Sequence, residues 1–539
     1  MSRPNPLVLT AGCLVFVVIF GALPLLKGGL YLDTHDGDSY HLLDILLRIE
    51  AGMQPHQDFR TPLGFLGFLP ITSFMNQGFE VGMATILGQL GVGLALLPLV
   101  IYVGWSRLTP WLALVFGFLT LGIALSLSFG GDGKGVSISM HYNRWSWSIA
   151  FVAIALAMLP SRSERPWLDG TMIGVLGMVL ALIKITYFVA LAPAAVVAVA
   201  LRWKTRGLVA VVVGAALVAI WVTATQGLAF WSAYLSDLIL VSDNEVRPTV
   251  GLSLSDAIAG IPFLGATLVG VASLFLIRRT EHFAAAQAIL LLVPGLIYVT
   301  YQNFGNEPLW LWLLGILVLA LRPHDDERTL AGMNVRALMT TVGIICFALN
   351  FSSVMSHGTS TVRHAMYDES RFLPMLPGHT GHQDIFIRND RAHMMTAQVH
   401  LDRQTQRWSQ YADKIDRPET PEFQGVQFPY CQFSAGSRAI LEQYAQDLQL
   451  AGLSSDDQVF LADNLTGLWM FGPFKPLERG APWYYGKLTG VENADFVVLP
   501  KCGFITRIRN IVMRELEEAG TPLTLVRDND LFAVFRVDL

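Results

Sequence analysis

An acidic loop and an amphipathic segment follow the first apolar run of the chain, in residues 32–52, LDTHDGDSYHLLDILLRIEAG. From Ser39 to Ala51 the apolar residues recur at near-helical spacing, and Gly52 has the backbone freedom that commonly ends a helix. The pattern predicts a short amphipathic helix that lies on the membrane surface, with Asp38 or Ser39 as its N-cap. Acidic side chains are therefore expected at the membrane surface, beside the start of this helix.

A polar element and a second apolar segment complete the same loop. Residues 54–64, QPHQDFRTPLG, follow the predicted helix, and an apolar segment continues to about Phe74. That segment is shorter than the ~20 residues that cross a membrane, so a second surface helix is expected. We therefore predict one long outer loop at residues 27–80, between the first two membrane spans.

The composition places most of the chain in a membrane. Of its 539 residues, 53% are hydrophobic and only 15% are charged, whereas soluble proteins carry about 25% charged residues. This balance excludes an ordinary soluble enzyme, a disordered protein and a coiled coil. The net charge is only -5, and no basic block of the kind that binds a phosphate backbone is present, which argues against nucleic acid as a partner.

Long apolar runs predict a polytopic α-helical membrane protein with about eleven spans. Most of the runs each correspond to one span. These runs lie at roughly residues 6–26, 81–103, 109–129, 144–160, 207–226, 256–277, 282–301, 309–322 and 334–353. As one helix, residues 169–201 would be about 50 Å long, which is too long for a single crossing. Two short helices that meet near Lys184 are therefore expected there.

The basic residues orient these spans. With two helices in residues 169–201, the following basic residues fall on one side of the membrane: Arg107, Arg162, Arg165, Arg202, Lys204, Arg206, Arg278, Arg279, Arg322 and Arg328. The positive-inside rule identifies that side as cytoplasmic. We expect a multi-pass protein of a bacterial inner membrane, with its N-terminus inside and its C-terminal region in the periplasm.

A change of composition near residue 354 predicts two domains. Residues 1–353 are expected to form a transmembrane domain, and residues 354–539 a soluble periplasmic α/β domain. In the second, helices are predicted near 434–450 and 503–518, and strands near 458–462, 494–500, 523–526 and 531–535. This alternation predicts parallel pairing and a terminal hairpin. The domain has neither a glycine-rich phosphate loop nor a recognisable nucleophile–base pair, so a binding or shaping role is expected.

Two cysteines of this soluble domain are predicted to form a disulfide. Cys431 and Cys502 are its only cysteines, and both lie at the ends of predicted elements. Thiols on the outer side of a bacterial inner membrane are oxidised. The alternative is a pair of free buried thiols, because the spacing does not fix how far apart the two Cα atoms lie.

The order of motifs in the first loop resembles that of a known family. The loop has an Asp-x-Asp tip, an amphipathic helix that ends in glycine, Pro-x-x-Asp-Phe at 55–59 and Pro-x-Gly at 62–64. This order is similar to the first outer loop of the GT-C superfamily of integral-membrane glycosyltransferases, as is the plan of about eleven spans with a C-terminal periplasmic domain. The resemblance implies a polyprenyl-phosphate-linked sugar donor, a catalytic carboxylate in this loop, and a lipid, glycan or protein acceptor.

The acids of the loop tip are the candidate catalytic residues, because a carboxylate can accept the proton of an attacking hydroxyl. Asp36 and Asp38 are the main candidates, with Asp33 as a third. Asp36 is favoured, since helix capping explains Asp38 without any chemistry. His35 and His41 flank the pair, so a divalent cation at Asp36 and Asp38 is an alternative, although hard cations prefer oxygen ligands. The main expectation is a site without a metal.

Basic residues near the outer face are candidates for binding the phosphate of the donor. They are Arg60, Arg144, Lys184 and Arg247. Asp58 and His41 are further substrate-binding candidates. Plainer alternatives are that Asp58 pairs with Arg60 across a turn and that Lys184 anchors a helix end. Trp147, near the start of a predicted span, is typical of the aromatic belt at a membrane interface.

The sequence favours a glycosyltransferase that moves a sugar from a polyprenyl-phosphate donor to an extracytoplasmic acceptor. The main alternative is a transporter or flippase of lipid-linked glycans, which would have internal repeats and ionisable residues at mid-membrane in several helices. No clear repeat is seen, and the acids gather in the outer loops. A structural assembly subunit is a third alternative, and it would need Asp36 for stability alone.

Overall fold

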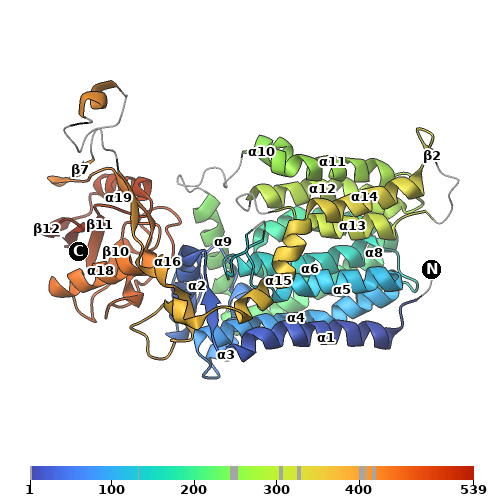
Figure 1. The fold of residues 1–539 in the computed structure, drawn as a ribbon, viewed down its shortest axis with the longest axis horizontal. Helices are drawn as coiled ribbons and strands as arrows, with labels where there is room; N and C mark the ends of the chain where they lie inside the picture. Colours follow the sequence, from blue (N-terminus) through green and yellow to red (C-terminus); the bar gives the residue numbers. More distant parts are fainter. Residues whose placement is uncertain are drawn as a thin grey trace.

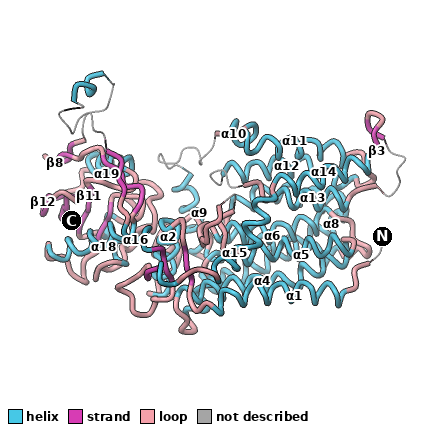
Figure 2. The backbone as a smooth tube through the Cα atoms, viewed as in Figure 1, coloured by secondary structure: helices cyan, strands magenta, loops and turns pink. Residues whose placement is uncertain are grey.

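The computed structural model describes residues 3–130, 133–242, 253–302, 307–323, 329–399, 407, 409–414 and 421–538. A bundle of long helices forms one part of the molecule, and a smaller region of strands and helices from the C-terminal part of the chain forms the other (Figure 1). The N-terminus lies at the end of the bundle that is far from this C-terminal region. Most strands lie in the C-terminal region and beside the helix of the first loop, as Figure 2 shows.

The bundle contains both long and short apolar helices. They are α1 (Pro6–Leu26), α4 (Val81–Arg107), α5 (Pro110–Leu125), α6 (His141–Met158), α7 (Pro166–Ile183), α8 (Ile185–Gln226), α9 (Ala229–Ser242), α10 (Leu254–Ala259), α11 (Ile261–Ile277), α12 (Phe283–Gln302), α13 (Trp310–Ala320), α14 (Val335–Leu349) and α15 (Phe351–Ala365). Within the described residues, five are long and apolar enough to cross a membrane, or six if α14 and α15, bent by 52°, form one broken span. The chain is thus a polytopic helical membrane protein, but the predicted count of about eleven spans is not confirmed, because helices such as α5 and α13 are short.

The predicted break near Lys184 is confirmed. Helix α7 ends at Ile183, Lys184 has an extended backbone with φ -154° and ψ 105°, and α8 begins at Ile185. Helix α8 is itself interrupted at Lys204, where φ is 53° and ψ is -144°. Residues 169–201 therefore belong to two helices rather than one, as the length argument requires.

Glycines allow α7 and the second half of α8 to approach closely. A Cβ atom added to Gly174 would lie 2.0 Å from the carbonyl oxygen of Val211, and one added to Gly214 would lie 2.1 Å from that of Thr171. Neither position has room for a larger side chain. Small residues at helix contacts are typical of membrane bundles, where close backbone packing replaces the hydrophobic effect as the main attraction.

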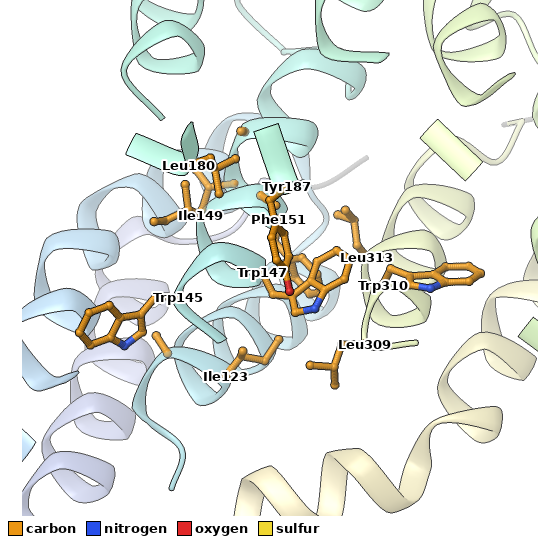
Figure 3. Close-up of a cluster of buried hydrophobic side chains, with 14 of the residues drawn as sticks. Ile123, Trp145, Trp147, Ile149, Phe151, Leu180, Tyr187, Leu309, Trp310 and Leu313 are labelled. Atoms are coloured by element: carbon orange, nitrogen blue, oxygen red, sulfur yellow. The ribbon is translucent and has the colours of Figure 1, made fainter. Parts of the chain in front are cut away.

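Large aromatic side chains fill the core at the start of α6 (Figure 3). The exposed fractions of Trp145 and Trp147 are 0% and 2%. The Trp147 ring packs edge-on against Tyr187 of α8, with 4.9 Å between the ring centroids. The expectation that Trp147 belongs to an interface belt is therefore wrong, because it packs inside the bundle rather than at its surface.

Charged residues collect at the end of the bundle that carries the N-terminus. Arg107, at the end of α4, forms a fully buried ion pair of 2.6 Å with Asp169, in the first turn of α7. Arg202 pairs with Glu164 at 2.8 Å, just before the interruption of α8. Arg162 donates to the carbonyl oxygen of Trp105 at 2.7 Å. These bonds tie the end of α4, the start of α7, the interruption of α8 and the loop between α6 and α7 together on one side of the bundle.

The first loop and the C-terminal region share a sheet. The strands of this sheet are β1 (Leu30–Leu32), β4 (Phe372–Pro374) and β5 (Ile385–Arg388). Strand β1 pairs in parallel with β5, which pairs antiparallel with β4. The sheet therefore joins residues from both sides of the predicted boundary near 354, and the first loop is held by the C-terminal region.

Helix α2 of the first loop (Asp36–Glu50) is buried rather than laid on a surface. It begins at Asp36, so Asp38 and Ser39 lie in its first turn and neither is its N-cap. Arg48, fully buried, bonds to Asp44 one turn before it and donates to the carbonyl oxygen of Leu477 at 2.8 Å. The helix has the predicted apolar face, but its opposite, more polar face is also covered, by the C-terminal region. The second predicted surface helix is short, α3 (Leu69–Met75).

The secondary structure predicted for the C-terminal region is confirmed. Its main elements are α18 (Ser437–Leu450), β10 (Val459–Leu461), β11 (Phe496–Pro500), α19 (Thr506–Ala519), β12 (Leu523–Asp528) and β13 (Phe532–Val537). The strand order is β10-β11-β13-β12, with β10 parallel to β11 and with β12 and β13 as an antiparallel hairpin. Shorter elements are α16 (Asn389–His393), β6 (Thr396–Val399), β7 (Glu422–Phe423), β8 (Val426–Gln427) and β9 (Cys431–Ala435), and β2 (Thr329–Leu330) with β3 (Met333–Asn334) lies on the bundle.

The predicted disulfide between Cys431 and Cys502 is present and closes a loop with a sequence separation of 71. Replacing both cysteines by serine should therefore destabilise this region by up to about 4 kcal/mol, because the unfolded chain regains the freedom of that loop. Hydrogen exchange of the β10 and β11 amides in the full-length protein measures the change. Reduction of the wild type serves as the control and should reproduce it, whereas unchanged exchange in the double variant would contradict the prediction.

Candidate functional site

A cavity of about 630 Å³ lies where the bundle meets the C-terminal region. Its walls come from the first loop, the start of α6, the break between α7 and α8, the ends of α9 and α12, and a loop of the C-terminal region. The polar and aromatic side chains that line it are Asp38, His41, His141, Tyr142, Lys184, Thr186, Ser242, Tyr298, Gln302, Trp483 and Tyr485. Apolar residues complete the walls, among them Leu42, Leu63, Phe68, Ile185, Leu238 and Val241.

Asp38 is the carboxylate of the predicted pair that lines this cavity. It lies half-buried in the first turn of α2. The hydroxyl of Ser139 donates a hydrogen bond to Asp38 Oδ2. The backbone of Ser139 is fixed in turn, because its carbonyl oxygen accepts a 2.8 Å bond from the buried guanidinium of Arg144.

Asp36 does not line the cavity, although the sequence favoured it over Asp38. It is 5% exposed and bonds to two residues of the C-terminal part of the chain. Arg391 of α16 donates from Nε to Asp36 Oδ1 at 2.8 Å, and Ser437 donates to Oδ2 at 2.9 Å. These contacts satisfy both carboxylate oxygens, so the structure places Asp36 where it fastens α2 to the C-terminal region.

Lys184 enters the cavity because the helix is broken at this residue. Its ammonium donates to Asn143 Oδ1 at 2.9 Å, and it lies 5.2 Å from the centre of the Tyr142 ring. Asn143 and Tyr142 belong to the first turn of α6, so two helices hold the charge in place. A cation at a helix break beside an apolar wall is suited to an anionic group that carries a hydrocarbon chain.

The C-terminal region supplies one wall of the cavity through a loop after β10. Tyr485 forms a 2.6 Å hydrogen bond to His41 Nε2, which fixes a predicted substrate-binding residue. Trp483 packs edge-on against the His41 ring at 5.0 Å, and its indole donates to Asn464. Sequence reasoning missed Trp483 and Tyr485, because nothing in the local pattern brings this loop to α2.

Arg60 and Asp58 lie outside the cavity lining. Arg60 pairs at 3.0 Å with Asp237 of α9, and His56 Nδ1 bonds to the other oxygen of Asp237 at 2.8 Å. Asp58 accepts a 2.7 Å bond from the backbone amide of Gln54. The expected alternative of an Asp58–Arg60 pair is thus replaced by a buried carboxylate that anchors the first loop to α9.

Helix α9 is a second element that sequence reasoning missed, since none of the predicted spans covers residues 229–242. Its buried residues are Phe230, Tyr234 and Asp237. Their spacing of four and three residues is helical, and this pattern would have indicated a helix with an acid on its packed face. Leu238 and Val241, one turn after Tyr234 and Asp237, continue this face to the cavity.

Arg144 and Arg247 are the remaining basic residues that were predicted to bind the phosphate of the donor. Arg144 is 2% exposed, lies outside the cavity lining, and donates from Nη1 to the carbonyl oxygens of Ser128 and Ser139 at 2.8 Å each. Arg144 therefore supports the backbone beside Asp38, and its role in substrate binding stays a prediction. Arg247 lies outside the described residues.

A divalent cation at Asp36 and Asp38 stays a prediction. Among the described residues, no group of three or more His, Cys, Asp or Glu side chains is arranged to hold a metal ion. Asp33, the third candidate acid, accepts bonds from the amide of Val136 at 2.7 Å and from the hydroxyl of Tyr367 at 2.6 Å. Burial lowers the pKa of His35, so this imidazole is neutral at pH 7.

The cavity therefore combines a carboxylate, an ammonium group and an extended apolar wall. The carboxylate can accept a proton, the ammonium can stabilise an anion, and the apolar wall can accommodate hydrocarbon. No family model matches the chain, and no curated protein or solved structure matches it either. The function has to be inferred from the chemistry of the cavity itself.

Proposed function

We propose that the protein is a membrane glycosyltransferase of the GT-C type, which transfers a sugar from a polyprenyl-phosphate donor to an extracytoplasmic acceptor. The observation that supports this most is that Asp38 and Lys184, from distant parts of the chain, line the same cavity. An acid and a cation beside apolar side chains match the three parts of such a reaction: an attacking hydroxyl, a departing phosphate and a lipid tail.

Asp38 would act as the general base. It accepts the proton of the acceptor hydroxyl while the hydroxyl oxygen forms a bond to the anomeric carbon of the sugar. The bond between that carbon and the phosphate oxygen breaks, and polyprenyl phosphate leaves with the bonding electrons. Lys184, held by Asn143, stabilises the charge on the departing phosphate. The rings of Trp483 and Tyr485 form the wall of the cavity beside His41.

Lipid analysis of a deletion strain tests this function. Loss of the enzyme should lead to accumulation of a polyprenyl-phosphate sugar, and a plasmid copy of the wild-type gene should remove it. A lipid pool that does not change on deletion would contradict the proposal. A flippase would instead move a fluorescent polyprenyl-phosphate lipid between leaflets of proteoliposomes without altering it chemically.

Lys184→Ala should weaken binding of polyprenyl phosphate by about ten- to a hundredfold, because a charge-assisted hydrogen bond contributes roughly 1.5–3 kcal/mol. Lys184→Arg is the matched control, since it keeps the positive charge and should retain most of the affinity. Titration of the lipid against the full-length protein in nanodiscs measures both. Equal affinity in the alanine variant and the wild type would exclude Lys184 from the phosphate site.

The proposed membrane arrangement has about eleven spans in a bacterial inner membrane, with the N-terminus inside and the cavity facing the periplasm. Two observations support it. Arg107, Arg162 and Arg202 lie together at the end of the bundle opposite to the cavity, as the positive-inside rule requires. The C-terminal region holds a disulfide, which is typical of an oxidising compartment.

A reporter enzyme that is active only in the periplasm should be active when it is appended to the C-terminus of the full chain. The same reporter inserted after Arg206 should be inactive there, because this position follows the interruption of α8 at the basic end of the bundle. A cytoplasmic reporter gives the reciprocal control at both positions. Cytoplasmic activity at the C-terminus would overturn the proposed orientation.

A further inference from the structure

Helix α15 has its apolar face outside and its polar face inside. It follows α14 after a bend of 52°. The apolar residues Phe351, Met355, Val362 and Met366, which are spaced along one face, are exposed by 59%, 48%, 43% and 79%. A helix whose outer face meets water has the opposite arrangement, with charged or polar residues outside.

The inner face of α15 is rich in hydroxyl and imidazole groups. The buried residues of this helix are Ser353, Ser356, His357, Ser360, Thr361 and His364. His357 is 2% exposed, and its Nδ1 bonds to the hydroxyl of Ser126 at 2.7 Å. Ser360 accepts a 3.0 Å bond from the backbone amide of Leu127, and the hydroxyls of Ser356 and Ser128 are 2.7 Å apart.

These bonds hold non-helical backbone between α5 and α6, of which residues 126–130 and 133–140 are described. Ser126, Leu127 and Ser128 begin this segment, and Ser139, which bonds to Asp38, lies near its end. Non-helical backbone at membrane depth needs protein partners, because lipid cannot satisfy its hydrogen bonds. The inner face of α15 provides such partners, so the helix separates the segment from whatever lies outside.

Three features identify lipid as the material outside α15. The exposed stripe continues the apolar surface of α14, where Ile344 and Leu349 are exposed by 59% and 47%. Helices α14 and α15 together are long and apolar enough for one broken span. Within α15, the guanidinium of Arg363 donates to Thr359 and to the carbonyl oxygen of Ser356, so its hydrogen bonds are made within the helix.

We propose that α15 lies in the bilayer, with Phe351, Met355, Val362 and Met366 in contact with lipid acyl chains, and that it seals the non-helical residues 126–130 and 133–139 from lipid. This inference goes beyond the proposed transferase activity and does not depend on it. It moves the edge of the membrane-embedded part beyond the predicted boundary near 354, and it places the backbone that supports Asp38 at membrane depth.

A fluorescent label at Met355→Cys tests the proposal in the full-length protein in nanodiscs. The free cysteines Cys13 and Cys346 are buried, so bimane should attach to the introduced thiol, and the unlabelled wild type checks this. Lipids brominated on their acyl chains should quench the label at least twofold, while aqueous iodide should have little effect. Val15→Cys in α1, at a residue exposed by 56%, is the lipid control, and Leu450→Cys, at a residue exposed by 81%, is the aqueous control.

Quenching of the Met355→Cys label by iodide, as at Leu450→Cys, would overturn the proposal and place α15 in water. Protection from both quenchers would also overturn it, because a protein partner or a second copy would then cover the stripe. If Met355→Cys does not fold, Met366→Cys on the same stripe gives the same readout. Neither result depends on transfer activity, so a failed transferase assay would leave this inference intact.

Discussion

Asp38→Asn should reduce sugar transfer by roughly 10²- to 10⁴-fold, the range for loss of a general base. The amide nearly matches the carboxylate in shape and can still accept the hydrogen bond from Ser139. It cannot accept the proton of the acceptor. Transfer is measured as restoration of the glycosylated product, and loss of the accumulated donor, in the complemented deletion strain. The melting temperature of the purified variant should equal that of the wild type.

Asp36→Asn is the matched control, because it changes the same residue type two positions away. In the wild type, the Asp36 carboxylate bonds to Arg391 and Ser437 outside the cavity. The Asp36→Asn variant should therefore lose stability and retain more activity than Asp38→Asn. An inactive Asp36→Asn beside an active Asp38→Asn would return the base to Asp36. Full activity in both variants would exclude both residues from the reaction.

The largest effect on stability is expected for Asp169→Ala. The change leaves the fully buried guanidinium of Arg107 without its partner at 2.6 Å, and Tyr102 loses the acceptor of a 2.7 Å bond. Removing one partner of a buried ion pair costs roughly 3–5 kcal/mol, because the remaining charge is neither hydrated nor paired. The free energy of unfolding of the purified protein in detergent, measured from denaturant titration, should fall by about this amount.

The double variant Arg107→Met, Asp169→Leu distinguishes the cost of an unpaired buried charge from the contribution of the ion pair itself. Replacing both charges by apolar groups of similar size is often neutral, so the double variant should recover most of the stability that Asp169→Ala loses. If Asp169→Ala costs less than about 1 kcal/mol, water must reach Arg107 and the pair is not sealed. A double variant as unstable as the single one would show that the ion pair itself holds α4 to α7.

Elements with a strong local pattern were predicted from the sequence. The hydropathy of α1 and α4, the length of residues 169–201 and the alternation of strands and helices after residue 434 depend only on neighbouring residues. The chain length compatible with one crossing was enough to place a break at Lys184, and the structure has it there. Length and hydropathy did not settle the number of spans, because several apolar helices are short.

Which of Asp36 and Asp38 lines the cavity depends on the residue at which α2 begins, and the sequence pattern placed that residue incorrectly. Two side chains that are two residues apart on a helix differ in direction by about 200° around the helix axis. Because α2 begins at Asp36 rather than Ser39, Asp38 faces the cavity and Asp36 faces Arg391. Local pattern also could not bring Tyr485 to His41 or Asp237 to Arg60, since these contacts join residues that are far apart in sequence.

The shared sheet between β1 and β5 also sets the order in which the molecule can be completed during synthesis. Asp36 and its partner Arg391 are 355 residues apart, and a ribosome that adds 5–20 residues per second needs roughly 20–70 seconds to make that stretch. During this interval α2 lacks the strand and the loops that later cover it. A nascent chain stalled before β5 would already have the helices α1 to α15 of the bundle, but its cavity would lack the wall that carries Trp483 and Tyr485 until the last part of the chain has been translated and has reached the first loop.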